Sequence, residues 1–125
     1  ALKDKKHRLI EILAKQKLQA ERWSILTDAI NIDRETSRDL LNFLQKQGTV
    51  VILEPDRAVL SEVFVEAKQR LIAYLTEHGE ISTQEAKTLF NLTRKHLIPL
   101  LETMDREGIT LRSDNARRLG AKRNE

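Results

Sequence analysis

The stretch from Asn91 to Arg112 reads NLTRKHLIPLLETMDREGITLR, and a related stretch, NIDRETSRDLLNFLQKQGTVVI, stands sixty positions earlier, from Asn31 to Ile52. Each opens with asparagine and an apolar residue, continues with apolar residues at helical spacing, and closes with a glycine before β-branched residues. This order predicts a turn, a helix, a left-handed glycine that ends the helix, and a strand. Two copies at a fixed period indicate two copies of one supersecondary unit.

The same order of elements extends outward from both stretches. In the first copy we expect helices over residues 3–15, 24–30 with Ser24 as N-cap, and 34–47, then strands over 49–53 and 58–60. In the second copy we expect a helix over 63–77, a short helix opened by the capping box Ser82-Thr83-Gln84-Glu85, a helix over 94–107, and strands over 109–112 and 117–119.

Two helices, a turn, a third helix and a β-hairpin form the winged-helix arrangement, in which a helix-turn-helix carries an appended wing. We therefore predict a mainly α fold with small β-hairpins, of the α+β class, built from two tandem winged-helix (helix-turn-helix) domains. Residues 1–62 form the first module and residues 63–125 the second. No linker rich in Pro, Gly or Ser separates them.

Composition narrows the classes of protein. The 125 residues contain no cysteine, which excludes disulfides, thiolate metal sites and a cysteine nucleophile. No apolar run approaches the roughly twenty residues of a membrane helix, so we expect no membrane partner. The chain begins at Ala1 without methionine, and we expect a fragment of a longer, cytoplasmic protein.

The net charge of +3 is unevenly distributed. Residues 1–92 hold 14 Lys and Arg and 14 Asp and Glu, whereas residues 93–123 hold 8 Lys and Arg against 4 Asp and Glu. The positive excess therefore lies in the last quarter of the chain. Such a surface attracts a polyanion and gains free energy by releasing its counterions; a solvated basic tail is the simpler interpretation.

No catalytic pattern is present. The three histidines lack metal-ligand spacing, and phosphate-binding glycine motifs and H-E-x-x-H are absent. We expect a binding protein rather than an enzyme, with no cofactor and no metal. Trp23 and Phe43 could stack on bases, but aromatic residues beside helical stripes are more often core residues.

The strongest candidate site is the start of the third helix in the second module, Thr93-Arg94-Lys95-His96. Thr93 can cap this helix, and three potential donors then lie where the free backbone N–H groups and the helix dipole already favour phosphate. In helix-turn-helix proteins this end of this helix enters the nucleic acid. Pro99 should bend the helix, because it cannot donate to the carbonyl of Lys95.

A second basic cluster lies on the predicted wing, at Arg112, Arg117 and Arg118. Strand alternation places Arg117 and Arg118 on opposite sides, so at most one faces a given ligand. The first module has an apolar wing and a helix start of mixed charge, Asp33-Arg34-Glu35-Thr36. We therefore predict that the first module is a spacer or interaction module and the second is the reader.

Residues 89–119 also resemble the last winged helix of the bacterial selenocysteine-specific elongation factors of the SelB type. That family carries a pattern like S-R-K-Y-x-x-P-L-L-E-Y-L-D-R-x-G-x-T-R-R-x-G-D-x-R, which Thr93 to Arg117 follow. Three positions depart from it: His96 replaces tyrosine, Leu111 replaces arginine and Asp114 replaces glycine. Over the rest of the chain the resemblance is weaker, and it implies the third and fourth winged helices of a longer protein.

The resemblance implies a function. In that family the N-terminal part is a GTPase carrying selenocysteinyl-tRNA, and the final winged helix binds an mRNA hairpin that recodes UGA. It implies that this chain binds such a stem-loop, with Thr93, Arg94 and Lys95 at the recognition helix and Arg112 and Arg117 on the wing. GTP and selenocysteinyl-tRNA would then be partners of the preceding domains, and the ribosome a further candidate partner; we expect a monomer.

Two other interpretations stay open. Winged helices commonly bind duplex DNA in transcriptional regulators, although here the basic excess is confined to one module and no long dimerisation helix is evident. The chain could also be a protein-interaction scaffold whose basic end is simply solvated.

Overall fold

The computed structural model describes residues 1–121 and divides the chain into two compact units, Ala1–Phe64 and Val65–Glu125. The division falls within helix α4 (Ser61–His78), and the boundary we predicted, after residue 62, lies in the first turn of the same helix. Lys122 and Arg123, which we counted in the basic excess, lie outside the described residues.

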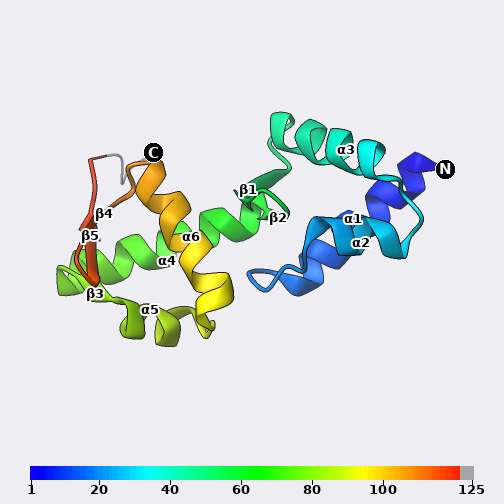
Figure 1. Cartoon of the computed structure of the whole chain (residues 1–125). Helices are drawn as coiled ribbons and strands as arrows, with labels where there is room; N and C mark the ends of the chain where they lie inside the picture. Colours follow the sequence, from blue (N-terminus) through cyan, green and yellow to red (C-terminus); the bar gives the residue numbers. More distant parts are fainter. Residues whose placement is uncertain (122–125) are drawn as a thin grey trace. The chain divides into compact units, whose positions relative to one another are not determined.

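Within residues 1–121, each unit contains three helices and a small antiparallel sheet, with α4 assigned to the second unit (Figure 1). The first comprises α1 (Leu2–Gln16), α2 (Trp23–Ala29), α3 (Arg34–Lys46) and the hairpin of β1 (Val50–Glu54) and β2 (Arg57–Leu60). The second comprises α4, β3 (Ile81–Ser82), α5 (Thr83–Phe90), α6 (Arg94–Arg106), β4 (Thr110–Ser113) and β5 (Ala116–Leu119). The predicted α+β class with winged helices is confirmed. No helix among residues 1–121 has the length and apolarity needed to span a membrane.

The sixty-residue repeat corresponds to a repeated backbone. Asn31 and Asn91, between the second and third helices of their units, both have positive φ, at 60° and 54°. Asparagine is among the few non-glycine residues that tolerate this region. Gly48 and Gly108 follow α3 and α6 with φ of 79° and 77°, as expected of glycines that end helices. The motif therefore repeats because both units need the same two left-handed residues.

Each unit buries its own apolar core. In the first, Trp23 is only 2% exposed and its indole Nε1 donates to the carbonyl of Ser37 at 2.8 Å, so the prediction of a core role for Trp23 is confirmed. The second core is built on the inner face of α6, where four side chains are fully buried: Leu97, Leu100, Leu101 and Met104.

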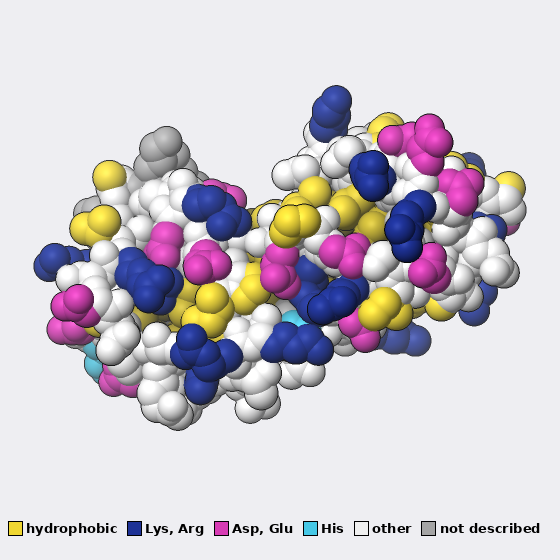
Figure 2. All heavy atoms as spheres, viewed as in Figure 1, with side chains coloured by type: hydrophobic (Ala, Val, Ile, Leu, Met, Phe, Trp, Pro, Cys, Tyr) yellow, Lys and Arg dark blue, Asp and Glu magenta, His cyan; other side chains and the backbone are white. Residues whose placement is uncertain are grey.

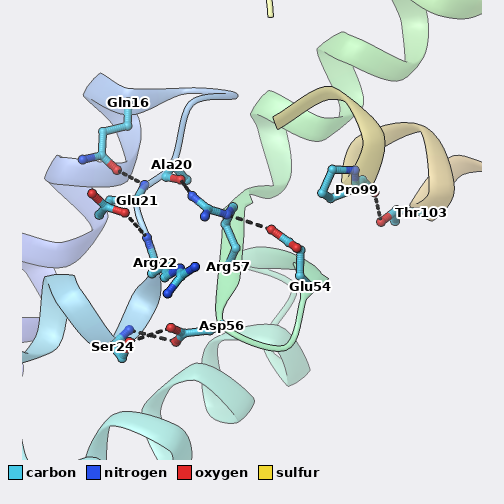
Figure 3. Close-up of polar contacts among 10 residues, drawn as sticks. All are labelled: Gln16, Ala20, Glu21, Arg22, Ser24, Glu54, Asp56, Arg57, Pro99 and Thr103. Atoms are coloured by element: carbon cyan, nitrogen blue, oxygen red, sulfur yellow. Dashed lines mark hydrogen bonds and ion pairs between the residues drawn. The ribbon is translucent and has the colours of Figure 1, made fainter. Parts of the chain in front are cut away.

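The prediction that Ser24 caps the second helix was wrong. Helix α2 begins at Trp23 with Arg22 in the N-cap position. The capping group is instead the Asp56 carboxylate, which comes from the β1–β2 turn and accepts from the backbone N–H of Ser24 at 2.9 Å and from its hydroxyl (Figure 3). A carboxylate 32 residues away thus satisfies the helix start, and the local pattern could not reveal it.

The sheet of the second unit has a strand that we did not predict. β3 pairs with β5, which pairs with β4, in the order β3-β5-β4. Next to this pairing, the N–H of Thr83 donates to the carbonyl of Asn115 at 3.3 Å. The tip of the wing is therefore attached to the start of α5.

The capping box of α5 predicts a defined response to acid. The Ser82 hydroxyl accepts from the N–H of Glu85, and the Glu85 carboxylate accepts from the N–H of Ser82. The hydrogen bond from the Ser82 backbone holds the pKa of Glu85 below the ordinary value of a glutamate. A carboxylate whose pKa is lowered by folding stabilises the fold at pH values above its unfolded-state pKa. This stabilisation is lost as the pH falls through the folded-state pKa. The stability difference between wild type and Glu85→Gln should be constant above about pH 5.5 and shrink below about pH 4.5.

Urea unfolding at several pH values, followed by far-UV circular dichroism, measures this difference. Glu66→Gln, which changes an exposed carboxylate on α4, is the control and should follow the wild type throughout. A Glu85→Gln difference that does not change between pH 6 and 3 would show that the box is not formed in solution.

Candidate nucleic-acid interface

The first candidate region is the start of α6, residues 93–96, which we call the helix tip. Thr93 occupies the N-cap position, and its carbonyl accepts from the N–H groups of His96 and Leu97 at 3.2 and 3.0 Å. Its side chain makes no capping hydrogen bond, so Thr93 marks the helix start by position alone. Thr93, Arg94 and Lys95 are exposed and His96 is half-buried. Two cations therefore stand beside the N–H groups and positive dipole end of a 13-residue helix, an arrangement that attracts anions.

The equivalent end of α3 has the opposite electrostatic character. There the Asp33 carboxylate accepts from the N–H of Thr36 at 2.8 Å, and this bond lowers the pKa of Asp33, so the side chain is ionised at neutral pH. Glu35 adds a second carboxylate in the first turn, beside Arg34. The free N–H groups and dipole of α3 are thus already neutralised by the chain's own acids.

The second candidate region is the wing, formed by β4, β5 and the turn between them. Arg112 pairs across the strands with Arg117, and Leu111 pairs with Arg118. Since cross-strand partners share a face, Arg112 and Arg117 lie on one face and Arg118 on the other. Arg117 is buried and Arg118 exposed, which confirms the prediction that they point to opposite sides. Arg112 is exposed, and its Nε donates to the carbonyl of Asp114 at 3.2 Å.

Arg117 does not belong to an accessible surface, so our inclusion of this residue among the RNA contacts needs correction. Its side chain is 3% exposed, and its Nε and Nη2 donate to the Asp105 carboxylate at 3.0 and 2.9 Å. The same carboxylate accepts from the hydroxyl of Thr110 at 2.6 Å. A guanidinium this deeply buried offers a ligand almost no surface, and its bonds to Asp105 attach the wing to the end of α6.

Helix α5 connects the two candidate regions. The wing tip is attached to the start of α5, and the helix tip follows its end after the turn 91–93. Helix α5 has eight residues and is about 12 Å long, and the turn 91–93 follows it before the helix tip. The structure thus places Arg94 and Lys95 beyond one end of α5 and the wing that carries Arg112 at its other end, whereas Arg118 lies on the opposite face of the wing from Arg112.

The turn of the wing explains one departure from the family pattern. Asp114 has φ of 56°, a region in which glycine is unstrained and aspartate is tolerated. The family's glycine and this aspartate therefore suit the same backbone. On the face shown in Figure 2, Lys and Arg are spread over both units, with Asp and Glu between them.

Phe43 differs from our prediction. We expected a core residue, but its side chain is 46% exposed on α3, and Lys6 of α1 lies over its ring with Nζ 5.8 Å from the centroid. Phe43 occupies the position on α3 that the buried Thr103 occupies on α6, so the helical stripe alone did not determine its burial.

Comparison with known proteins places these elements in a family. Residues 73–119 match the family model described as "Elongation factor SelB, winged helix". The second unit is a SelB-type winged helix. The matching model represents the third winged helix of SelB, so the prediction that these residues form the last one is not supported by this match.

Individual relatives agree with this assignment. Over 94 residues, 72% of this chain, the sequence is 34% identical to the selenocysteine-specific elongation factor of Haemophilus influenzae. The mRNA-binding domain of SelB from E. coli, solved in complex with SECIS RNA, has the same fold (TM-score 0.77, 22% identity, 93% of this chain and 97% of that one). A bacterial selenocysteine-specific elongation factor matches with a TM-score of 0.73 at 25% identity, over 92% of this chain and 18% of its own. The chain spans only 14% of the Haemophilus influenzae protein.

Because Arg117 is buried and Arg118 is exposed, we predict that their substitution by alanine changes stability by very different amounts. Arg117→Ala should lower the free energy of unfolding of the second unit by about 2–3 kcal/mol, less than for a fully buried pair because the Asp105 side chain is 22% exposed. Arg118→Ala should change it by no more than about 0.5 kcal/mol. Backbone amide signals of α6 during urea unfolding are the suitable measure, because the single tryptophan lies in the first unit. Equal stabilities would contradict a structural role for Arg117.

Proposed function

We propose that this chain binds an mRNA stem-loop, the selenocysteine insertion element, as part of a selenocysteine-specific elongation factor. The observation that carries the proposal is the helix tip: Arg94 and Lys95 are exposed at the start of a recognition helix in a SelB-type domain. The E. coli protein of similar fold is an mRNA-binding domain in complex with SECIS RNA, which supports the same ligand.

The size of the cationic surface favours an RNA hairpin over a long duplex. Among residues 1–121, the cationic side chains that we expect one ligand to contact are Arg94 and Lys95 at the helix tip and Arg112 on the wing. Thr93 and His96 lie beside the first two. Because the major groove of A-form RNA is deep and narrow, sequence-specific binding targets loops and bulged bases. A few donors placed at the two ends of one short helix suit the tip of a hairpin.

The first unit takes a different part in this proposal. The ionised Asp33 carboxylate would repel a phosphate from the start of α3. The start of α6, which is the equivalent position in the second unit, would attract one. We therefore assign residues 1–62 a spacer or protein-interaction role and residues 63–125 the role of reader. The ribosome is a further candidate partner of the chain.

The remaining activities belong to the whole protein. Selenocysteinyl-tRNA and GTP would bind domains outside this chain, which itself acts as a non-catalytic, monomeric binding fragment in the cytoplasm, where translation takes place.

Substitutions at the two equivalent helix tips test the proposal. Arg94→Ala or Lys95→Ala should weaken stem-loop binding by about 1–3 kcal/mol, because each removes a charged contact to RNA. Arg34→Ala, the matched change at the start of α3, should leave affinity unchanged. Fluorescence anisotropy with a labelled stem-loop measures all three, and equal losses at Arg34 and Arg94 would show that both units contact RNA.

A competition experiment separates the candidate functions. Gel shifts at several salt concentrations should show that a SECIS-type stem-loop binds more tightly than an unstructured RNA or a DNA duplex of equal length. The affinity should fall as salt rises, since phosphate contacts release counterions. Preference for the duplex would support a DNA-binding regulator, and no binding to any of the three would support a protein-interaction scaffold.

A further inference from the structure

One position of the sixty-residue repeat is connected differently in the two units. Arg57 of the first unit is 5% exposed, and its Nε donates to Glu54 on its own hairpin at 2.8 Å (Figure 3). Its Nη1 donates to the carbonyl of Ala20, in the connection between α1 and α2. These contacts attach the first hairpin to the connection before α2, and none of them reaches α3.

The equivalent residue of the second unit, Arg117, is attached to the recognition helix. Its partner Asp105 lies in the last turn of α6 and also accepts from Thr110 of β4. One carboxylate therefore binds both strands of the wing, and β4 lies beside this end of α6 (Figure 1). In the first unit the corresponding position of α3 is the exposed Gln45. The different connection thus follows from an aspartate at position 105.

We propose that Asp105 and Arg117 are positioning residues for stem-loop binding, which fix the wing relative to the helix tip. This inference rests on the proposed function. The bonds to Asp105 hold the base of the wing on the end of α6, and the bond from Thr83 to Asn115 holds its tip on α5. With both ends held, Arg112 stands at a set distance from Arg94, and one ligand meets both without first ordering the wing. Preorganisation of this kind raises affinity by lowering the entropy lost on binding.

Electrostatics within the wing gives Asp105 a second effect. Arg112 and Arg117 are direct cross-strand partners, and like charges in that relation repel. The Asp105 carboxylate neutralises Arg117. Arg112 therefore keeps its place on the strand and its charge remains directed to solvent.

A double-mutant cycle tests the proposal, with a stem-loop RNA selected from a random-loop library for binding to the wild-type chain. Arg112→Ala should lower affinity about tenfold in the wild-type background, as for one lost charged contact, but less than about twofold in Asp105→Asn. Arg94→Ala should lower the affinity for the stem-loop by the same factor in the wild type and in Asp105→Asn. A purely structural role for Asp105 would reduce both effects together.

Two controls keep the outcome clear. Arg57→Gln removes an equally buried arginine from the first unit and should leave affinity within about twofold of wild type. Thr110→Val removes one of the hydrogen bonds to Asp105 but keeps the charge of the carboxylate. In this background the loss of affinity caused by Arg112→Ala should be partly reduced. Circular dichroism identifies any variant that fails to fold.

The results that overturn the proposal are distinct from those that overturn the function. If the selected stem-loop binds but the Arg112→Ala effect is the same in both backgrounds, or Arg57→Gln and Asp105→Asn lose equal affinity, the positioning role is wrong. If the library yields no binder, the proposed function fails, and this inference with it.

Discussion

The buried face of α6 is the constraint on which the rest of the second unit depends. Leu97, Leu100, Leu101 and Met104 are fully buried, which fixes the rotation of the helix about its axis. Arg94 and Lys95, in the first turn, consequently face solvent. The same burial sets the other end of the helix, where Asp105 meets the wing. Core packing therefore decides which cations a ligand can reach.

The two units show how one backbone supports different surfaces. Asparagine in the turn and glycine after the third helix recur at equivalent positions with nearly equal φ values. The functional differences lie in single side chains: Asp33 neutralises the start of α3, whereas Thr93 leaves the start of α6 open to an anion. Likewise, Asp105 stands where α3 has Gln45. Function is set here by side chains on a repeated frame, as expected when a site is added to a fold.

Much of the fold could be predicted from the sequence because its signals are local. Helical spacing, the left-handed residues and the capping box of α5 each involve residues within a few positions of one another. The errors have a common cause in contacts between distant residues. Ser24 lost its expected capping role to Asp56, and Arg117 lost its expected ligand role to Asp105, a partner that only the folded wing brings near. The short strand β3 has no periodicity to detect. The sequence repeat could have predicted the burial of Arg117. Arginine occupies the equivalent position 57 in the first unit, which indicates a structural role common to both units.

The most direct test is a chemical-shift footprint of a SECIS-type stem-loop on the intact, isotope-labelled chain. If the second unit is the reader, backbone signals of residues 93–96 and of the wing around Arg112 should shift on titration, while those of residues 33–36 should not. Shifts concentrated at the start of α3, or spread over the first unit with none at the helix tip, would contradict the central claim.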